Sequence, residues 1–212
     1  MSLSEQMAML DHARFEQQSH FVNALPLTEN GLLIREISVG DVPGFHEIAT
    51  HLGFSYYCFD GSRESTERFV HAAISTQRCG SEAMRESFML AVEEVSTHKV
   101  VGHVSADVLD KDPEHFDLAY FTHPKYQRHG IAQNAATALL RQLFSSFDIN
   151  AIVATVHPEN YPSLKVLSRI GFKSTGKTTK VESANGKNDR LCFCLTRKQF
   201  ETAHPIIKAL SL

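Results

Sequence analysis

The sequence contains 212 residues, of which 42% are hydrophobic and 21% are charged. This composition is typical of a globular protein with one sizeable core, and we expect a single main domain. The net charge of −3 and the pI near 6.4 exclude a general nucleic-acid binder, because neutralising phosphates needs a basic face and the sequence has no run of Lys and Arg.

The N-terminal segment lacks the basic and then apolar layout of a signal peptide, and no stretch approaches the roughly 20 apolar residues that cross a bilayer. We therefore expect a cytoplasmic protein with no membrane partner. The 12 histidines are scattered without metal-site spacing, so we expect no metal. The same holds for the cysteines, which we interpret as buried free thiols: Cys58, Cys79, Cys192 and Cys194.

Residues 1–30 are predicted to form a partly helical N-terminal extension, residues 31–197 the main domain, and residues 198–212 a C-terminal tail. The domain opens with a strand in "GLLIREIS". Two helices follow, in "DVPGFHEIATHLG" and "SRESTERFVHAAISTQRCG", because each has an N-capping residue at its start and a glycine at its end.

Three β-rich runs come next, "SFMLAVEEV", "KVVGHVSADVL" and "HFDLAYFTH", and the short polar turns between them predict an antiparallel meander. A helix from Gly130, a strand in "FDINAIVATVHP", a helix in "NYPSLKVLSRIGF" and two strands around Asn185-Gly186 complete the domain. The predicted order is βααβββαβαββ. This order predicts an α/β (α+β) fold with a mixed, mostly antiparallel central sheet covered by helices on both faces.

The junction between the third run and the next helix contains a Q-x-x-G-x-A motif, Gln127-Arg128-His129-Gly130-Ile131-Ala132. A glycine and a small residue at a helix start leave free N–H groups that suit an anion, and the helix dipole adds to the effect. The motif is neither a Walker A loop nor a dinucleotide fingerprint. Taken alone, it is equally consistent with an ordinary helix start, because the helix carries a regular apolar stripe.

A second motif, N-x-x-S, begins the later helix at Asn160 and Ser163, and Gly171-Phe172 ends it. The two motifs, in this order and on these elements, resemble the GNAT superfamily of acetyl-coenzyme A dependent N-acetyltransferases. The likeness covers residues 32 to 197 and is greatest to the group that acetylates N-terminal amines of ribosomal proteins. It implies an enzyme that transfers an acetyl group from acetyl-coenzyme A to a primary amine by direct attack in a ternary complex.

The resemblance also implies where acetyl-coenzyme A binds. The strands at His115–His123 and Ile149–His157 should separate, with the pantetheine arm between them. Main-chain groups of Phe121, Thr122 and His123 would contact the acetyl end. The motif residues Gln127, Arg128, His129, Gly130, Ile131 and Ala132 would hold the pyrophosphate, and Asn160 and Ser163 would lie beside the thioester.

Transfer to an amine needs a base for the amine and a proton donor for the departing thiolate. Many GNAT proteins place a tyrosine four residues before the Gly-Phe pair as the donor, but this chain has Leu167 there. Ser163 is therefore the candidate donor, although capping alone would explain Asn160. Asp117 is the candidate base, with His115, Glu93 and Glu94 as rivals, and a base acting through water is a further possibility.

The sequence does not identify the acceptor, which is a protein N-terminal amine, an amino acid or polyamine, or an aminoglycoside-like compound. The helices at Val42–Leu52 and Ser62–Gln77 should line its site, and their acids Glu47, Glu64 and Glu67 would attract a cationic amine. The alternative function is a non-catalytic acyl-coenzyme A sensor on the same fold.

Both terminal segments carry apolar residues, including Met7, Met9, Leu10, Phe15 and Phe21 in one and Ile206, Ile207 and Leu210 in the other. Leaving such residues exposed is unfavourable. They are expected either to fold back on their own domain or to pack across a homodimer interface.

Overall fold

The computed structural model describes residues 3–51, 59–77, 85–109, 112–183 and 186–205, which are built around one eight-stranded sheet of order β1-β2-β3-β4-β5-β6-β8-β7. The strands are β1 Leu27–Glu29, β2 Leu32–Glu36, β3 Ser87–Glu94, β4 Lys99–Leu109, β5 Asp112–Thr122, β6 Ala151–Val156, β7 Lys173–Ser183 and β8 Gly186–Thr196. The helices are α1 Leu3–Asn23, α2 Val42–His51, α3 Arg63–Gln77, α4 Ile131–Ser146, α5 Tyr161–Ile170 and α6 Arg197–Ala203, with short 3-10 turns at Val39–Asp41 and Pro124–Tyr126.

The sheet is mixed, since β5 and β6 run parallel and every other neighbouring pair is antiparallel. The meander β3-β4-β5 and the predicted order of strands and helices are confirmed. The strand β1 was not predicted. It has three residues and pairs with β2, so the sheet begins before Leu32, where the sequence pattern placed its first strand.

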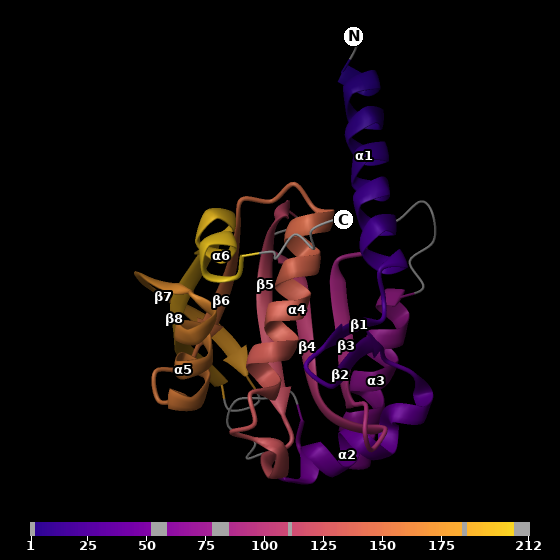
Figure 1. Ribbon diagram of the computed structural model, residues 1–212, viewed down its shortest axis with the longest axis vertical. Helices are drawn as coiled ribbons and strands as arrows, with labels where there is room; N and C mark the ends of the chain where they lie inside the picture. The colour runs from indigo at the N-terminus through magenta and orange to yellow at the C-terminus, as the bar shows by residue number, and fades with distance from the viewer. Residues whose placement is uncertain (1–2, 52–58, 78–84, 110–111, 184–185, 206–212) are drawn as a thin grey trace, which may run out of the picture.

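Helices cover both faces of the sheet, as predicted, and each face has its own core. The helices α1, α4, α5 and α6 pack with Leu90, Phe116 and Ile152 into the larger cluster on one face. The helices α2 and α3 pack with Ala91 and Phe121 on the other. Figure 1 shows α4 lying along β4 and β5 on the face turned toward the viewer. Successive side chains of a strand alternate between faces, so β5 contributes to both cores.

The two terminal helices are anchored to the domain by their inner ends. Phe21, near the end of α1, is fully buried with its ring centroid 4.4 Å from that of Phe88. Arg197, at the start of α6, donates to the carbonyl oxygen of Phe147 at 2.9 Å. The outer turns of α1 project away from the body, and Met9 is 62% exposed there. No helix in the described part of the chain is long and apolar enough to cross a membrane.

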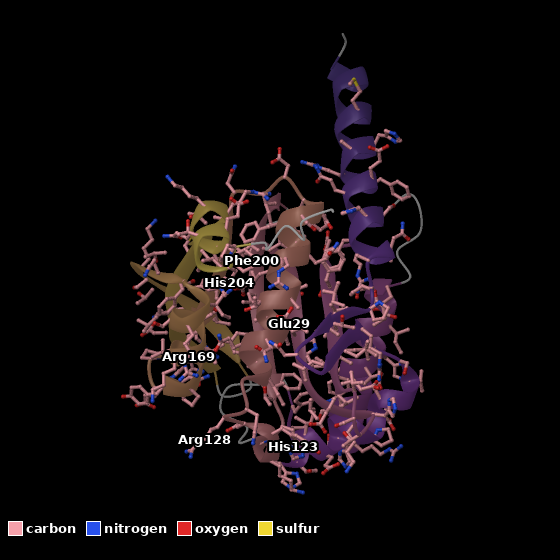
Figure 2. The ribbon with its side chains drawn as sticks, viewed as in Figure 1. Glu29, His123, Arg128, Arg169, Phe200 and His204 are labelled. Carbon is pink, nitrogen blue, oxygen red and sulfur yellow. The ribbon has the colours of Figure 1, made fainter. Side chains whose placement is uncertain are left out.

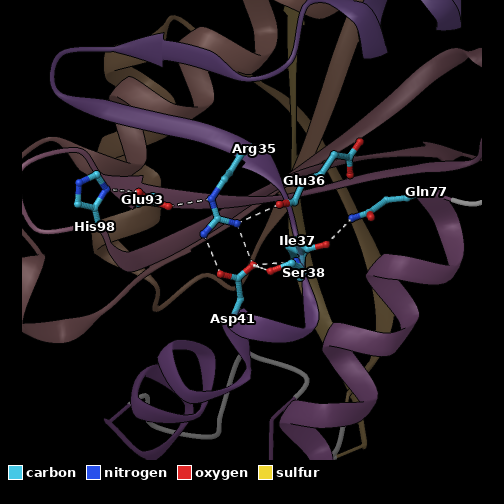
Figure 3. A network of polar contacts seen from close by, with 8 residues as sticks. All are labelled: Arg35, Glu36, Ile37, Ser38, Asp41, Gln77, Glu93 and His98. Atoms are coloured by element: carbon cyan, nitrogen blue, oxygen red, sulfur yellow. Dashed lines mark hydrogen bonds and ion pairs between the residues drawn. The ribbon is translucent and has the colours of Figure 1, made fainter.

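An ion-pair network fixes the start of α2 to the sheet (Figure 3). The Arg35 guanidinium donates to both carboxylate oxygens of Asp41, at 2.8 Å each, and to Glu93 at 2.8 Å. His98 lies 3.1 Å from the other Glu93 oxygen. Because Asp41 directly precedes α2, this network positions the helix over its face of the sheet.

Candidate active site

The strands β5 and β6 form a gap in the sheet. Their parallel pairing covers three residue pairs, from His115–Ala151 to Asp117–Val153. Beyond these, β5 continues to Thr122 and β6 to Val156, and in the described chain no further pair joins them. The antiparallel ladder between β4 and β5 continues to Thr122. The strands therefore separate toward their carboxyl ends, as the family resemblance implied.

The loop after β5 has a backbone suited to an anion. Gly130 caps α4 with a φ of 77°, and Arg128 has a φ of 67°. For a residue with a side chain this left-handed conformation costs roughly 1–2 kcal/mol. The first helical bond runs from Asn134 N to Gly130 O at 2.8 Å, so the N–H groups before Asn134 have no partner within the helix. Such N–H groups, next to left-handed residues, form a concave anion-binding surface.

The role of Gly130 is conformational. A Cβ atom there would meet the Asn134 side chain at 3.7 Å, which is an ordinary contact, so the positive φ is what favours glycine. Arg128 and Lys125 are exposed beside the loop, and Figure 2 shows Arg128 at the same end of the molecule as His123. The side chains of Gln127 and His129 are exposed too. The loop from Gln127 to Ala132, called the cradle below, therefore combines free backbone donors with positive charge.

The end of β5 is held close to β4. A Cβ atom on Gly102 would lie 2.6 Å from the carbonyl oxygen of Phe121, a distance that side-chain atoms do not tolerate. The side chain of Phe121 is buried, with rings of the α2–α3 core around it. Thr122 faces the other side, and its buried hydroxyl has no hydrogen-bond partner among the described residues. An unpartnered buried hydroxyl is unfavourable, so it needs a water or a ligand.

His123 joins the end of β5 to α2. Its side chain is 2% exposed, and its Nδ1 atom accepts a hydrogen bond from the Lys125 N–H at 3.1 Å. Burial first of all lowers the pKa of His123, so the ring is neutral with its proton on Nε2. That nitrogen lies 3.5 Å from Glu47 Oε1 and makes no closer polar contact among the described residues. Glu47 also lies 3.8 Å from Lys125 Nζ.

The start of α5 brings two hydroxyl groups together. Asn160 caps the helix, because its side-chain oxygen accepts from the Ser163 N–H at 3.2 Å. The Ser163 hydroxyl lies 3.0 Å from the hydroxyl of Tyr120, which comes from β5. Leu167, one turn further on, is fully buried in the core. The sequence motif located Ser163, but it gave no sign of Tyr120, whose contact depends on β5 and α5 meeting in space.

Two carboxylates lie side by side on the α2–α3 face. Asp117 on β5 pairs directly with Asp107 on β4. Asp107 accepts from the Ser87 hydroxyl, whereas the buried Asp117 Oδ1 has no hydrogen-bond partner among the described residues. Burial, and secondly the charge of Asp107, raises the pKa of Asp117 to about 7. Burial also raises the pKa of Asp107. A carboxyl with a pKa near 7 is suited to proton transfer at neutral pH.

The rival acids are engaged elsewhere. Glu93 belongs to the Arg35 network, and the hydrogen bond from Arg35 is the main cause that lowers the pKa of Glu93. Glu94 accepts from Thr97 at 2.7 Å in the turn after β3. On α3, Glu64 and Glu67 form exposed i,i+4 ion pairs with arginines, at 3.0 and 2.9 Å. Of the three acids expected to attract an amine, Glu47 is therefore the one that reaches the end of β5.

The cysteine and metal expectations can be compared with the described residues. Cys192 and Cys194 on β8 are free and only partly buried, and both face the α2–α3 side, because they pair with Thr155 and Val153. Cys58 and Cys79 lie outside the described residues. Within the residues that the structure describes, no group of three or more His, Cys, Asp or Glu side chains is arranged to hold a metal ion.

Known proteins match this chain over most of its length. The acetyltransferase (GNAT) domain family matches residues 31–173. An uncharacterized N-acetyltransferase, YnaD of Bacillus subtilis, is 29% identical over 154 residues, which cover 71% of this chain and 84% of YnaD.

Two solved structures illustrate the shared fold. A putative ribosomal-protein-serine acetyltransferase from Vibrio cholerae has a TM-score of 0.70 at 20% identity, over 80% of this chain and 96% of its own. Mycobacterium smegmatis RimJ, in complex with CoA-disulfide, has a TM-score of 0.68 at 21% identity, over 84% and 90% of the two chains.

Proposed function

Because the chain belongs to the GNAT acetyltransferase family, whose members transfer acetyl groups from acetyl-coenzyme A, we propose that it acetylates a primary amine in the gap between β5 and β6. The acceptor is a protein N-terminal amine or an amine-bearing small molecule. The observation that carries the proposal is the strained loop before α4. Arg128 keeps a left-handed conformation that costs energy, and such strain persists at sites where it serves a ligand.

The residues around the gap fit acetyl-coenzyme A. The N–H groups of Arg128 to Ala132 would hold the pyrophosphate, with Arg128 and Lys125 adding charge. The pantetheine arm would bind along the open edge of β5, in the position that a neighbouring strand would otherwise occupy. The buried Thr122 hydroxyl, on the α4 face next to this edge, has no hydrogen-bond partner in the described part of the chain. The Asn160 side chain retains its NH₂ group for a ligand, because capping uses only its oxygen.

Acetyl-coenzyme A supplies an acetyl thioester, which a neutral amine attacks directly. The acetyl group passes to the amine, and coenzyme A is released as a thiol. Asp117 accepts the proton that the amine must lose, directly or through water, because its raised pKa keeps it a competent base near pH 7. Ser163 donates its hydroxyl proton to the leaving sulfur. Tyr120, whose hydroxyl lies 3.0 Å from that of Ser163, then donates a proton to the serine and regains one from solvent. The phenol thereby supplies the acid that Leu167 cannot supply.

The acceptor enters from the α2–α3 face in this proposal. The Asp117 and Asp107 carboxylates lie on that face, and Glu47 stands at the end of β5 beside His123. Negative charge along this path favours the approach of an ammonium group. The acids Glu64 and Glu67 are neutralised by Arg68 and Arg63 and contribute less.

The test is thiol release from acetyl-coenzyme A in the presence of a panel of amines: amino acids, polyamines, aminoglycosides and peptides with free N-termini. We expect release that depends on an amine and a product heavier by one acetyl group. A protein that binds acetyl-coenzyme A tightly and releases no thiol with any amine would instead be a sensor, and the proposal would fail.

A further inference from the structure

We infer that the acetyl acceptor carries an oxyanion, either a carboxylate or a phosphate, in addition to its amine, and that Arg190 binds this group. The inference rests on the proposed function, since it names the class of amine that the same site takes.

Arg190 is a buried cation to which the described residues offer no counter-charge. The residue is 9% exposed, and its buried Nε atom has no hydrogen-bond partner in the part of the chain that the structure describes. None of the ion pairs formed within the described residues includes Arg190. Burying an arginine side chain without pairing it is costly, and buried charges are normally paired. A ligand that brings a negative charge would remove this cost.

The strand register puts Arg190 on the acceptor face. Arg190 on β8 has the same parity as Cys192 and Cys194, which pair with Thr155 and Val153 on β6. Val153 pairs with Asp117, so all of these side chains point to the α2–α3 side. The adjacent Asp189 points to the opposite face and is exposed. The coenzyme cradle belongs to α4, which packs on that opposite face.

The register also puts Arg190 at the open end of the gap. Leu191 pairs with Val156, the last residue of β6, so Arg190 lies one residue beyond the end of the strand. Beyond the Asp117–Val153 pair the two strands are no longer paired, but counting four residues along each from that pair reaches Phe121 on β5 and the residue after Val156 on β6. The main chain of Phe121 is where the acetyl group is proposed to lie. This count places Arg190 and the proposed reacting centre at a similar depth in the sheet, two strands apart.

The distances suit a small zwitterion. Neighbouring strands lie about 4.8 Å apart, so β8 is about 10 Å from β5, and the gap adds to this separation. An arginine side chain spans part of this distance. The Nε–H and the adjacent Nη–H form one edge of the guanidinium, and this edge binds carboxylate and phosphate through two parallel hydrogen bonds. An amine a few bonds from an acid would reach both groups, as in an amino acid.

The experiment compares three amines of similar length: β-alanine, its uncharged amide, and phosphoethanolamine. We expect kcat/KM for at least one of the two anionic amines to exceed that for the amide by about ten- to a hundredfold, as for a charge-assisted hydrogen bond. Arg190→Gln should abolish this preference by raising KM for the anionic amine, while the amide is acetylated as before. Arg190→Lys should restore part of it.

Two measurements separate recognition from a structural role and from turnover. Arg190→Gln should leave the melting temperature unchanged or higher, because it removes an unpaired charge, and it should leave coenzyme A affinity unchanged. Calorimetric titration of the wild-type complex with coenzyme A should show binding of the preferred anion that Arg190→Gln loses, whether or not acetylation occurs. Lys180→Gln, which removes an exposed charge on β7, is the matched control.

Three results would overturn the inference. One is an amide that serves as well as both anionic amines. Another is an Arg190→Gln variant that slows all amines equally or melts earlier. The third is anion binding that Arg190→Gln leaves intact. A protein that releases no thiol with any of the amines would defeat the proposed function. The titration would still test Arg190 on its own.

Discussion

The two faces of the sheet build their parts of the site in different ways. On the α4–α5 face the main parts are short runs of sequence, the loop before α4 and the first turn of α5, where Asn160 caps the helix. On the α2–α3 face the parts are single residues from four elements: Glu47 on α2, Asp107 on β4, Asp117 on β5 and Arg190 on β8. Strand register and helix packing place these residues on one face. The site residues on the first face are close together in the sequence, whereas those on the second face are far apart in the sequence and are brought together by folding.

The difference separates two kinds of recognition. A cofactor site made of main-chain groups binds the same cofactor whichever acceptor is used. Changes to this site should therefore lower the rate of acetylation of every acceptor alike. A site made of side chains from several strands can vary without disturbing the cradle, so changes to it should depend on the acceptor or on pH. The variants below test this division, beginning with the largest expected effect.

Gly130→Asp should weaken acetyl-coenzyme A binding by about a thousandfold. It forces a side chain into a left-handed conformation and sets a negative charge beside the pyrophosphate, where two charges 4 Å apart repel by roughly 4 kcal/mol near a protein surface. Calorimetry measures the affinity. Gly176→Asp is the matched control, since Gly176 has a φ of 72° at an exposed irregularity of β7, with no atom near its absent Cβ. Equal affinity in both variants would refute the cradle.

Ser163→Ala should lower kcat by about ten- to ten-thousandfold for every acceptor, with little change in coenzyme A affinity. The loss arises because the leaving sulfur no longer receives a proton. Ser168→Ala, an exposed position on the same helix, should be neutral. Steady-state rates with a thioester of a more acidic thiol sharpen the test, because a better leaving group should shrink the defect. Wild-type turnover by Ser163→Ala would remove this role.

Asp117 should govern the pH profile. A base must be deprotonated, so kcat/KM should rise as pH increases through about 7, the pKa of Asp117, and Asp117→Asn should lower the rate and remove this rise. Asp107→Asn removes the neighbouring charge, which should lower the pKa of Asp117 and move the rise to lower pH.

Stability should follow the opposite trend. The folded-state pKa of Asp117 is raised above its unfolded value, so the folded chain binds the proton more tightly. The free energy of unfolding should therefore fall as pH rises from about 4 to about 7, and Asp117→Asn should weaken this dependence. Urea unfolding across that range measures it. A pH dependence unaffected by Asp117→Asn would assign the titration to another group.

Tyr120→Phe should have the smallest effect, a two- to tenfold loss of kcat, since one neutral hydrogen bond contributes about 0.5–1.5 kcal/mol. Added to Ser163→Ala it should cost almost nothing further, because Tyr120 acts through Ser163. Rates of the two single variants and the double variant decide this. Independent losses in the double variant would show that Tyr120 does not act through the serine.

The sequence predicted what depends on neighbours along the chain. The element order, the helix start at Gly130 and the Asn160 cap follow from periodicity and capping residues, and the structure confirms them. The three-residue strand β1 was missed because so short a segment has no measurable alternation. The pairs Asp107–Asp117 and Tyr120–Ser163 could not be predicted, since each depends on a register or a packing angle between distant segments.

A crystal structure of the protein with coenzyme A tests the central claim most directly. We predict pyrophosphate oxygens on the N–H groups of Arg128 to Ala132, the pantetheine arm along β5 between Phe121 and His123, and the sulfur within hydrogen-bond distance of the Ser163 hydroxyl. Coenzyme A bound away from the gap between β5 and β6, or with its sulfur remote from Ser163, would contradict the account.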